Sequence, residues 1–290
     1  MPTKLTPEIL SEYYRRKFSV APLLKVVSVE NFDHREFGFL VISEEEQERF
    51  IRNLSFKTPF ELKKFMSERG VLAAYVGALF DPPPTPETSI TQLRWLGREL
   101  VFDIDLTDYD DLRTCGKGKD HVCPVCWKFV VDAALIIDET LREDFGFSKI
   151  VWVYSGRRGV HAWVLDKEAK ELSEEAREAV AVYVSPDSPD EPLAYRYQMR
   201  LLKMYAMRNN ILLTNLRKRD IQKLWKEVRK SIPRIDKKVT MDHVRLLRVP
   251  GSVHNATGRI VTIIKDIQEF YIDDAPTVWD VLGIDLAETK

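Results

Sequence analysis

Residues 99–111 read ELVFDIDLTDYDD, and this stretch decides how the chain is organised. The apolar residues around Phe102 indicate a short, largely buried strand. Side chains two positions apart on a strand share a face, so Asp103 and Asp105 should point the same way. Neighbouring carboxylates repel each other and are costly to bury, which favours a hard divalent cation in front of them. The alternative is a solvated strand end, although aspartate is disfavoured in strands.

The composition of the chain is that of a globular protein. Its 290 residues suffice for one large domain or two modest ones, and 44% hydrophobic residues can form a core. The 44 Lys and Arg nearly cancel the 45 Asp and Glu, so polyanion binding would require local clustering. The sequence contains no run of about 18 apolar residues, and no apolar signal region follows Met1. We therefore expect an intracellular protein.

Local patterns predict helices and strands along most of the chain. A cap residue followed by proline predicts helix starts at Thr6 and Thr58, and Gly70 should end the second helix. Further helices are expected at 129–141, at 173–184 and from Pro276. Strands are expected at 23–29, 35–42, 71–80, 150–154, 160–165, 244–249 and 260–264.

All three cysteines fall within residues 115–126. This clustering is better suited to a metal site in a reducing compartment than to a disulfide framework. Cys115, His121, Cys123 and Cys126 offer three thiolates and one imidazole, which complete a tetrahedral zinc site. A closed ligand set predicts a structural zinc. The alternative is buried thiols beside a surface histidine.

The segment 155–161, SGRRGVH, joins two predicted strands as a hairpin turn. Glycines allow a close backbone approach to a ligand, and the guanidinium groups of Arg157 and Arg158 are suited to oxygen-rich anions. Taken alone, the residues are equally compatible with phosphate binding and with a solvated turn followed by a core His161.

A basic stretch follows the proline-rich linker at 185–192. Residues 196–238 contain 14 Lys or Arg against only Asp220, Glu227 and Asp236, which predicts a basic, mostly helical subdomain. Such a surface can contact nucleic acid or a partner, but it can equally be solvated.

In their order along the chain and in their residues, these motifs resemble the catalytic small subunit of archaeal and eukaryotic DNA primase. The resemblance covers most of residues 5–265 and is carried by segments 34–37, 99–111, 115–127, 144–147, 154–161 and 246–254. It implies an α+β fold with a central, mostly antiparallel sheet flanked by helices. It also implies a catalytic core at 1–184 and 232–290, which contains the zinc knuckle at 115–126, and a helical subdomain at 185–231.

The activity implied by the resemblance is primer synthesis on single-stranded DNA from nucleoside triphosphates, a two-metal nucleotidyl transfer that releases pyrophosphate. Asp103, Asp105 and Asp236 would be the catalytic residues and would hold two Mg²⁺ or Mn²⁺ ions. The implied nucleotide-binding residues are Ser155, Arg157, Arg158, His161, Arg248 and His254, with Arg35 as a further candidate. Cys115, His121, Cys123 and Cys126 would hold the structural Zn²⁺.

The implied partners are a primase large subunit carrying an iron-sulfur cluster, the DNA template and the triphosphates, with a replicative polymerase as a further candidate and no membrane. The location would be the nucleus in a eukaryote and the cytoplasm or nucleoid in an archaeon.

Two features depart from eukaryotic relatives. His121 stands where they carry a cysteine, and residues 73–75 lack the lysine and aspartate that lie near the sugar. Tyr75 could pack against the ribose instead, and weaker discrimination against deoxynucleotides is our hypothesis. Rival readings are a stand-alone primase-polymerase of repair or of a mobile element, a metal-dependent Asp-x-Asp glycosyltransferase, and a zinc-bearing nucleic-acid module without activity.

Overall fold

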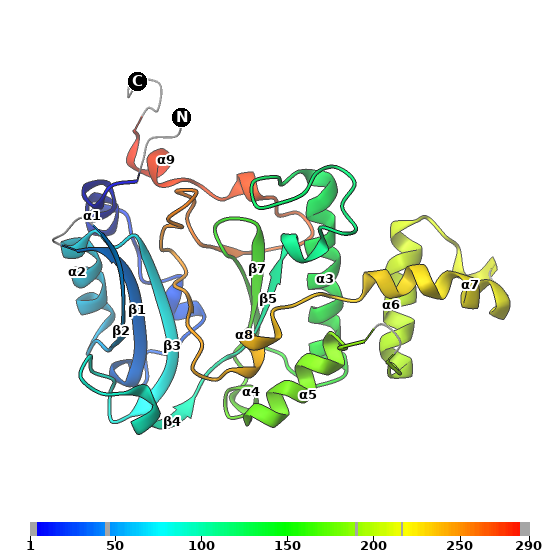
Figure 1. Cartoon of the computed structure of the whole chain (residues 1–290), viewed down its shortest axis with the longest axis horizontal. Coiled ribbons are helices and arrows are strands. Elements are labelled where there is room, and N and C mark those ends of the chain that lie inside the picture. Colours follow the sequence, from blue (N-terminus) through cyan, green and yellow to red (C-terminus); the bar gives the residue numbers. More distant parts are fainter. Residues whose placement is uncertain (1–4, 44–46, 189–190, 216, 285–290) are drawn as a thin grey trace.

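Two antiparallel β-sheets lie side by side in the computed structural model, which describes residues 5–43, 47–188, 191–215 and 217–284 (Figure 1). The first sheet has the order β2-β1-β3-β4, with β8 paired to β3, and the second has the order β5-β7-β6-β9. The strands are β1 Arg35–Ile42, β2 Glu48–Leu54, β3 Ala73–Asp81, β4 Arg94–Gly97, β5 Leu100–Asp105, β6 Ile150–Tyr154, β7 Gly159–Val164, β8 Leu247–Arg248 and β9 Thr262–Ile264. The prediction of an α+β fold is confirmed, but the expected single central sheet is divided into two.

Helices pack around both sheets or extend away from them (Figure 1). They are α1 Pro7–Arg16, α2 Pro59–Arg69, α3 Pro124–Glu143, α4 Lys167–Lys170, α5 Glu174–Val184, α6 Tyr195–Arg208, α7 Lys218–Val228, α8 Lys237–Met241 and α9 Val278–Leu282. The predicted caps are confirmed, because the hydroxyls of Thr6 and Thr58 accept N–H groups of their helices and Gly70 ends α2 in the left-handed conformation.

The two faces of strand β5 point into different parts of the molecule, because successive side chains of a strand point to opposite faces. Its even-numbered apolar residues pack against α3 in one core. Val101 lies in another core, together with Trp163 of β7 and residues of the first sheet. Asp103 and Asp105 share the face of Val101, so both carboxylates point toward the space between the two sheets.

Some expected elements are wrong. Residues 23–29 form no strand but begin with a short 3-10 helix, Leu23–Lys25. The buried Leu23, Val26 and Val27 follow a helical spacing, which the strand assignment overlooked. Strand β2 was missed because four of its seven residues are polar or charged and none is buried at the edge of the sheet. The strand expected at 244–249 contracts to β8.

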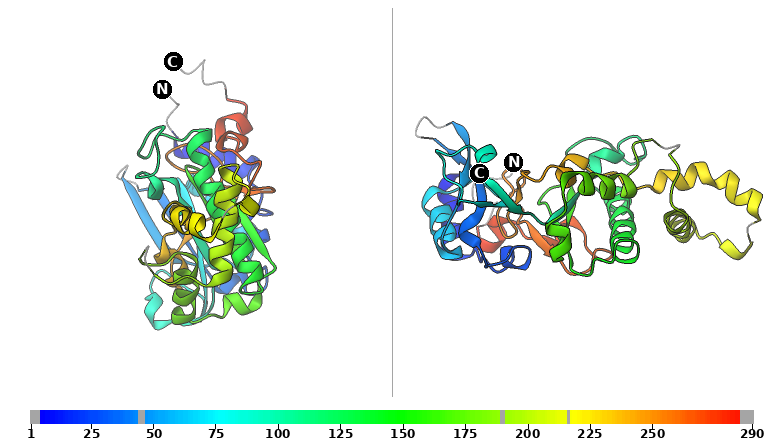
Figure 2. Two further views of the ribbon diagram at one scale, coloured as in Figure 1. Left: turned by 90° about the vertical axis from the view of Figure 1, so that its right-hand side faces the viewer. Right: turned by 90° about the horizontal axis from the view of Figure 1, so that it is seen from below.

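Helices α6 and α7 project from the rest of the molecule (Figure 2). They share a small core of their own, in which Tyr197, Leu201 and Val228 are buried with Ile136 of α3. The assignment of 185–231 as a helical subdomain, between core segments 1–184 and 232–290, stays a prediction. Within the described residues, none of the helices is long and apolar enough to cross a bilayer.

Arg35, expected as a nucleotide contact, instead forms a buried ion pair. Its guanidinium is 2.7 and 3.0 Å from the two carboxylate oxygens of Glu99 and also donates to the carbonyl of Gly77. Both side chains of the pair are only 1% exposed. The Arg35 assignment is therefore wrong: the residue ties β1 of the first sheet to the residue that precedes β5.

Replacing Glu99 with alanine should destabilise the chain by about 3–5 kcal/mol, because Arg35 would remain buried without its counterion. Equilibrium unfolding in urea would measure this. Asp81→Ala is the control, since Asp81 pairs with Arg94 on the surface and should cost at most about 1 kcal/mol. Equal losses in both variants would contradict a buried tie between the sheets.

Candidate active site

Three predicted carboxylates converge at the end of β5. Asp103 lies opposite His161 of β7, and Asp105 lies opposite Gly159. Asp236, far away in the sequence, donates its backbone N–H to the carbonyl of Asp103 at 3.0 Å. The structure therefore brings Asp236 next to the Asp-x-Asp pair.

The electrostatics of this cluster fit a divalent cation. Burial, followed by the negative charges of Asp105, Asp236 and Asp108, raises the pKa of Asp103 to about 7. The pKa of Asp108 is also raised, first by burial and then by Asp105 and Asp236. Carboxylate oxygens are the ligands that Mg²⁺ and Mn²⁺ prefer, and a cation would relieve this repulsion.

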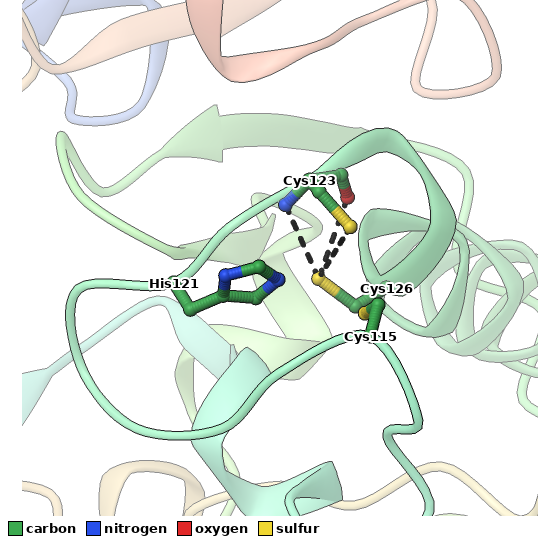
Figure 3. A group of neighbouring side chains, drawn as sticks. All are labelled: Cys115, His121, Cys123 and Cys126. Carbon is green, nitrogen blue, oxygen red and sulfur yellow. Dashed lines mark hydrogen bonds between the residues drawn. The ribbon is translucent and has the colours of Figure 1, made fainter.

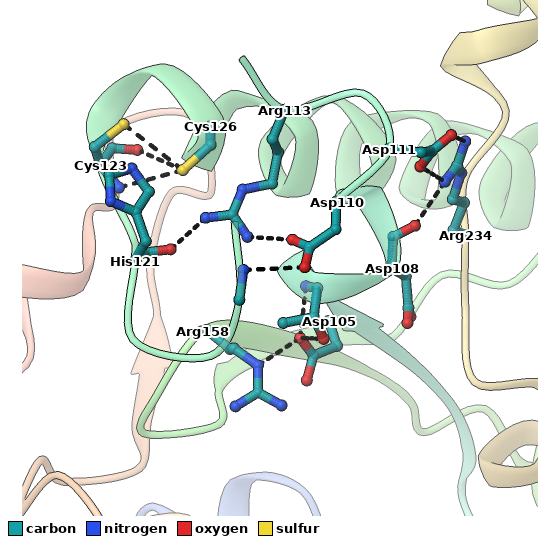
Figure 4. Close-up of polar contacts among 12 residues, drawn as sticks. Asp105, Asp108, Asp110, Asp111, Arg113, His121, Cys123, Cys126, Arg158 and Arg234 are labelled. Atoms are coloured by element: carbon teal, nitrogen blue, oxygen red, sulfur yellow. Dashed lines mark hydrogen bonds and ion pairs between the residues drawn. The ribbon is translucent and has the colours of Figure 1, made fainter. Parts of the chain in front are cut away.

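Arg158 meets the cluster from the hairpin turn (Figure 4). Its Nε donates to Asp105 Oδ1 at 2.8 Å, and the same oxygen accepts the backbone N–H and the hydroxyl of Thr107, each at 2.8 Å. One oxygen of Asp105 is thus fixed by the protein, and the other has no partner within the described part of the chain.

The hairpin turn that carries Gly156 lies close to the loop that carries His254. Gly156 has φ +96°, and a Cβ there would lie 2.6 Å from His254 Cβ, so only glycine fits. The next residue, Arg157, donates to the exposed carboxylate of Asp120 at 2.7 Å. Arg157 is therefore linked to the loop of residues 115–126, the zinc loop, which carries the predicted zinc ligands.

Arg248 of β8 borders the same space. Its guanidinium lies 5.2 Å from the ring centre of Tyr75, and its Nη2 donates to the side chain of Asn255 at 3.1 Å. Arg248 Nη1 and His161 Nδ1 are buried without a partner among the described residues. Buried polar atoms are normally paired, so unpaired ones beside a cavity fit a polar ligand.

Both histidines are neutral at physiological pH. Burial, together with Arg248 and Arg98, lowers the pKa of His161 to about 4. Burial and the cationic Arg248, Arg157 and Arg158 lower the pKa of His254 to about 3. His254 Nδ1 accepts the backbone N–H of Ala256 at 3.1 Å, so its ring proton is on Nε2 and can be donated.

These groups line one cavity of about 460 Å³. The predicted residues on its wall are Asp103, Asp105, Asp236, Ser155, Arg157, Arg158, His161, Arg248 and His254. Tyr75, Arg245 and Asn255 line it as well. Carboxylates and guanidinium groups therefore line the same cavity, which suits a polyphosphate bound together with metal ions.

The four predicted zinc ligands also come together (Figure 3). One ligand atom from each of Cys115, His121, Cys123 and Cys126 lies within 4.8 Å of all the others. A hydrogen bond from the backbone of Cys126 is the main cause that lowers the pKa of Cys123 to about 6, which favours the thiolate. His121 Nε2 is buried without a partner in the described chain. This Cys₃His set fits zinc.

The zinc loop is tied to the residues that follow β5 (Figure 4). Asp110 accepts from Arg113 at 2.5 Å and from the backbone N–H of Gly118 at 3.0 Å. Arg113 is buried and also donates to the carbonyl of His121. The knuckle therefore packs against the same turn that carries Asp105.

The sequence did not indicate several residues that complete the site. Asp108 adds a fourth carboxylate, Asp120 holds Arg157, and Asn255 holds Arg248. Asp108 had a possible signal, its place in the acidic run of residues 99–111. The other two are recognised only by their partners, which lie far away in the sequence.

Zinc content is the first test of the knuckle. The full chain should purify with a single zinc ion, and Cys126→Ser should lose it and melt at a lower temperature, because the metal closes the loop. Mass spectrometry of metal content and thermal denaturation would measure both. His121→Cys is the matched control, since four thiolates also hold zinc. A zinc-free wild type as stable as Cys126→Ser would contradict a structural zinc.

The raised pKa of Asp103 predicts a pH-dependent stability. Its folded pKa, about 7, exceeds the ordinary value of 3.8, so the folded chain binds more protons and stability falls as pH rises between these values. In buffer without divalent ions, Asp103→Asn should therefore be more stable than wild type at pH 8, by about 1–3 kcal/mol.

Urea titrations at pH 8, 6 and 4 would measure this gain, which should shrink toward pH 4. Asp138→Asn, which alters an aspartate paired with Arg142 outside the cavity, should give no such gain. A destabilised Asp103→Asn at pH 8 would show that the carboxylates do not repel one another.

Known proteins resemble the chain over most of its length. The DNA primase small subunit from Drosophila melanogaster is 42% identical over 189 residues, which cover 62% of this chain and 42% of that protein. The small subunit PriS from Thermococcus onnurineus is 30% identical over an alignment of 312 positions, which covers 90% of this chain and 87% of that protein. The chain spans about two fifths of the length of the eukaryotic relatives.

A solved structure extends the comparison to the fold. The polymerase domain of Mycobacterium tuberculosis Ligase D, in complex with DNA, has a TM-score of 0.52 and 14% identity, and the match covers 98% of this chain and 90% of that one. A model of the DNA primase small subunit family matches residues 102–266, which hold the three carboxylates, the knuckle, the arginine turn and His254. The chain belongs to the DNA primase small subunit family.

Proposed function

We propose that the chain synthesises short primers on single-stranded DNA by transferring nucleotides from nucleoside triphosphates and releasing pyrophosphate. The observation that carries this proposal is the meeting of Asp236 with Asp103 and Asp105 in a cavity that Arg157, Arg158 and Arg248 also line. Family membership supports the same activity.

The acidic wall would bind two divalent ions. Asp103, Asp105 and Asp236 are the ligands we assign, and Mg²⁺ or Mn²⁺ there would activate a 3′-hydroxyl and neutralise the departing pyrophosphate. The protein itself positions the carboxylates before the ions bind. The pair between Asp105 and Arg158 fixes one oxygen of Asp105 at 2.8 Å.

The basic wall would bind the triphosphate. Arg157, Arg158 and Arg248 supply positive charge, and guanidinium groups donate to phosphate oxygens in a fork geometry. His254 is neutral and donates from Nε2, and His161, also neutral, can supply one N–H. Since neither ring needs to gain a proton, both contacts would persist across the physiological pH range. Ser155 would add a hydroxyl from the start of the turn.

Tyr75 is the side chain that we assign to the sugar. Its ring is fixed between Arg248, at 5.2 Å, and the edge of Phe50, whose ring centre lies 5.5 Å away. A tyrosine held in this way can pack against a ribose or a deoxyribose, which supports the hypothesis of weak discrimination between them.

Partners follow from the family and from the surface. We propose a large subunit with an iron-sulfur cluster as the partner in initiation and a replicative polymerase as a further one. The helical subdomain would help to contact the template, because Lys223 and Lys226 are exposed cations on α7.

An assay of primer synthesis tests the proposal. On single-stranded DNA with Mg²⁺ or Mn²⁺ and all four triphosphates, the wild type should make short products, and Asp105→Ala should lower the rate by at least about a thousandfold because the shared metal ligand is lost. Nucleotide-sugar hydrolysis in the same buffers would reveal a glycosyltransferase instead.

The matched control is Asp138→Ala. Asp138 also pairs with an arginine, at 2.7 Å, but lies on α3 outside the cavity, so this variant should keep wild-type activity. Thermal denaturation would establish that both variants fold. Equal activity of folded Asp105→Ala and wild type would refute the assigned site.

A further inference from the structure

Arg234 joins the segment before α8 to the turn after β5 (Figure 4). We call Arg234, with Tyr109 and Asp111, the arginine clamp. Arg234 stands two residues before Asp236, and Tyr109 and Asp111 stand four and six residues after Asp105. The clamp therefore connects the neighbourhoods of two carboxylates that are far apart in the sequence.

The clamp holds Arg234 by its backbone and by its side chain. The Arg234 N–H donates to the hydroxyl of Tyr109 at 2.8 Å. The guanidinium donates to both oxygens of the Asp111 carboxylate, one of them at 3.0 Å, and to the carbonyl of Asp108 at 2.6 Å. It also lies 5.4 Å from the ring centre of Tyr109. Two-pronged contacts of this type fix orientation as well as distance.

The exposure of the pair shows that stability is not its main effect. Asp111 is 62% exposed and Arg234 is 35% exposed, and ion pairs in water contribute little to folding. Tyr109, by contrast, is buried and stacks on Phe129 of α3. The clamp therefore attaches the Arg234 segment to a buried ring that is packed against α3.

Asp236 needs such an attachment. Its carboxylate caps α8 by accepting the N–H of Lys238 at 3.0 Å, and its N–H reaches Asp103 at 3.0 Å. Its carboxylate lines the same cavity as those of Asp103 and Asp105, and like charges repel one another when no cation is bound. A metal site gains affinity when its ligands are held in place before the ion arrives.

We propose that Tyr109, Asp111 and Arg234 are positioning residues that hold Asp236 where it can share divalent ions with Asp103 and Asp105. This inference rests on the proposed function, since it assigns a role in the same metal site. The clamp residues themselves need not touch metal or nucleotide.

Binding of Mn²⁺ to the zinc-loaded full chain tests the clamp without any primer synthesis. Electron paramagnetic resonance of free Mn²⁺ would give dissociation constants for wild type, Asp111→Asn, Tyr109→Phe and Asp236→Ala. We expect Asp111→Asn and Tyr109→Phe to raise the constant about three- to tenfold, and Asp236→Ala to raise it further. Asp111→Glu, which keeps the charge, should recover part of the loss.

Asp81→Asn is the matched control, because it removes a carboxylate from an exposed pair with Arg94 on the other sheet. It should leave Mn²⁺ binding unchanged. In primer synthesis, Asp111→Asn should need more Mg²⁺ for half-maximal rate, while the KM for triphosphate at saturating Mg²⁺ stays the same.

Unchanged Mn²⁺ affinity in folded Asp111→Asn and Tyr109→Phe, beside weakened binding in Asp236→Ala, would overturn the clamp and leave the proposed function intact. If these two variants melt at a lower temperature but bind Mn²⁺ as tightly as wild type, the clamp is a structural contact and does not position Asp236. If the wild type binds Mn²⁺ through Asp236 but makes no primer, the proposed function fails, and the Mn²⁺ constants still decide on the clamp.

Discussion

Repulsion among the carboxylates at the end of β5 is the constraint on which the site depends. Asp103 and Asp105 share a strand face, and Asp236 is hydrogen-bonded to the backbone of Asp103. Because the cluster is partly buried, water screens it poorly, and the pKa of Asp103 rises to about 7. Positive charge must therefore come from a bound cation or from the arginines across the cavity. Arg158, at 2.8 Å from Asp105, is the contact through which the protein itself supplies part of that charge.

The residues after β5 connect the carboxylate cluster to other segments of the molecule. Asp110 holds the zinc loop through Arg113, and Asp111 holds the segment that leads to Asp236 (Figure 4). The zinc loop in turn reaches the arginine turn, because Asp120 pairs with Arg157. A single short turn thus contacts the zinc loop, the Asp236 segment and the arginine turn directly, the last because the N–H of Leu106 donates to the carbonyl of Arg158 at 3.2 Å. The knuckle is therefore coupled to the part of the cavity lined by Arg157, although none of its four candidate metal ligands lines that cavity.

The period of the strands explains why part of this architecture was predictable. The alternation in β5 and the glycines around Arg157 are local signals, and the structure matches them. The placement of Asp236 came from the family resemblance, since no local pattern distinguishes it from any other helix cap. Arg35 was assigned wrongly because its motif gives no information about burial, and its partner Glu99 lies 64 residues away in the sequence, just before β5. Pairs such as Arg157 with Asp120 form between segments that only the tertiary fold brings together, so no spacing rule could have found them.

The position of the helical projection follows from the same contacts. The chain leaves the core after α5, passes through α6 and α7, and returns at Arg234, where α8 packs against both α5 and β5. Both ends of the excursion are thus fixed to the core next to the carboxylates. A change in length or sequence between these two anchors alters the projecting surface, but the contacts that place Asp236 lie on the core side of both connections. The projecting surface and the carboxylate cluster can therefore vary independently.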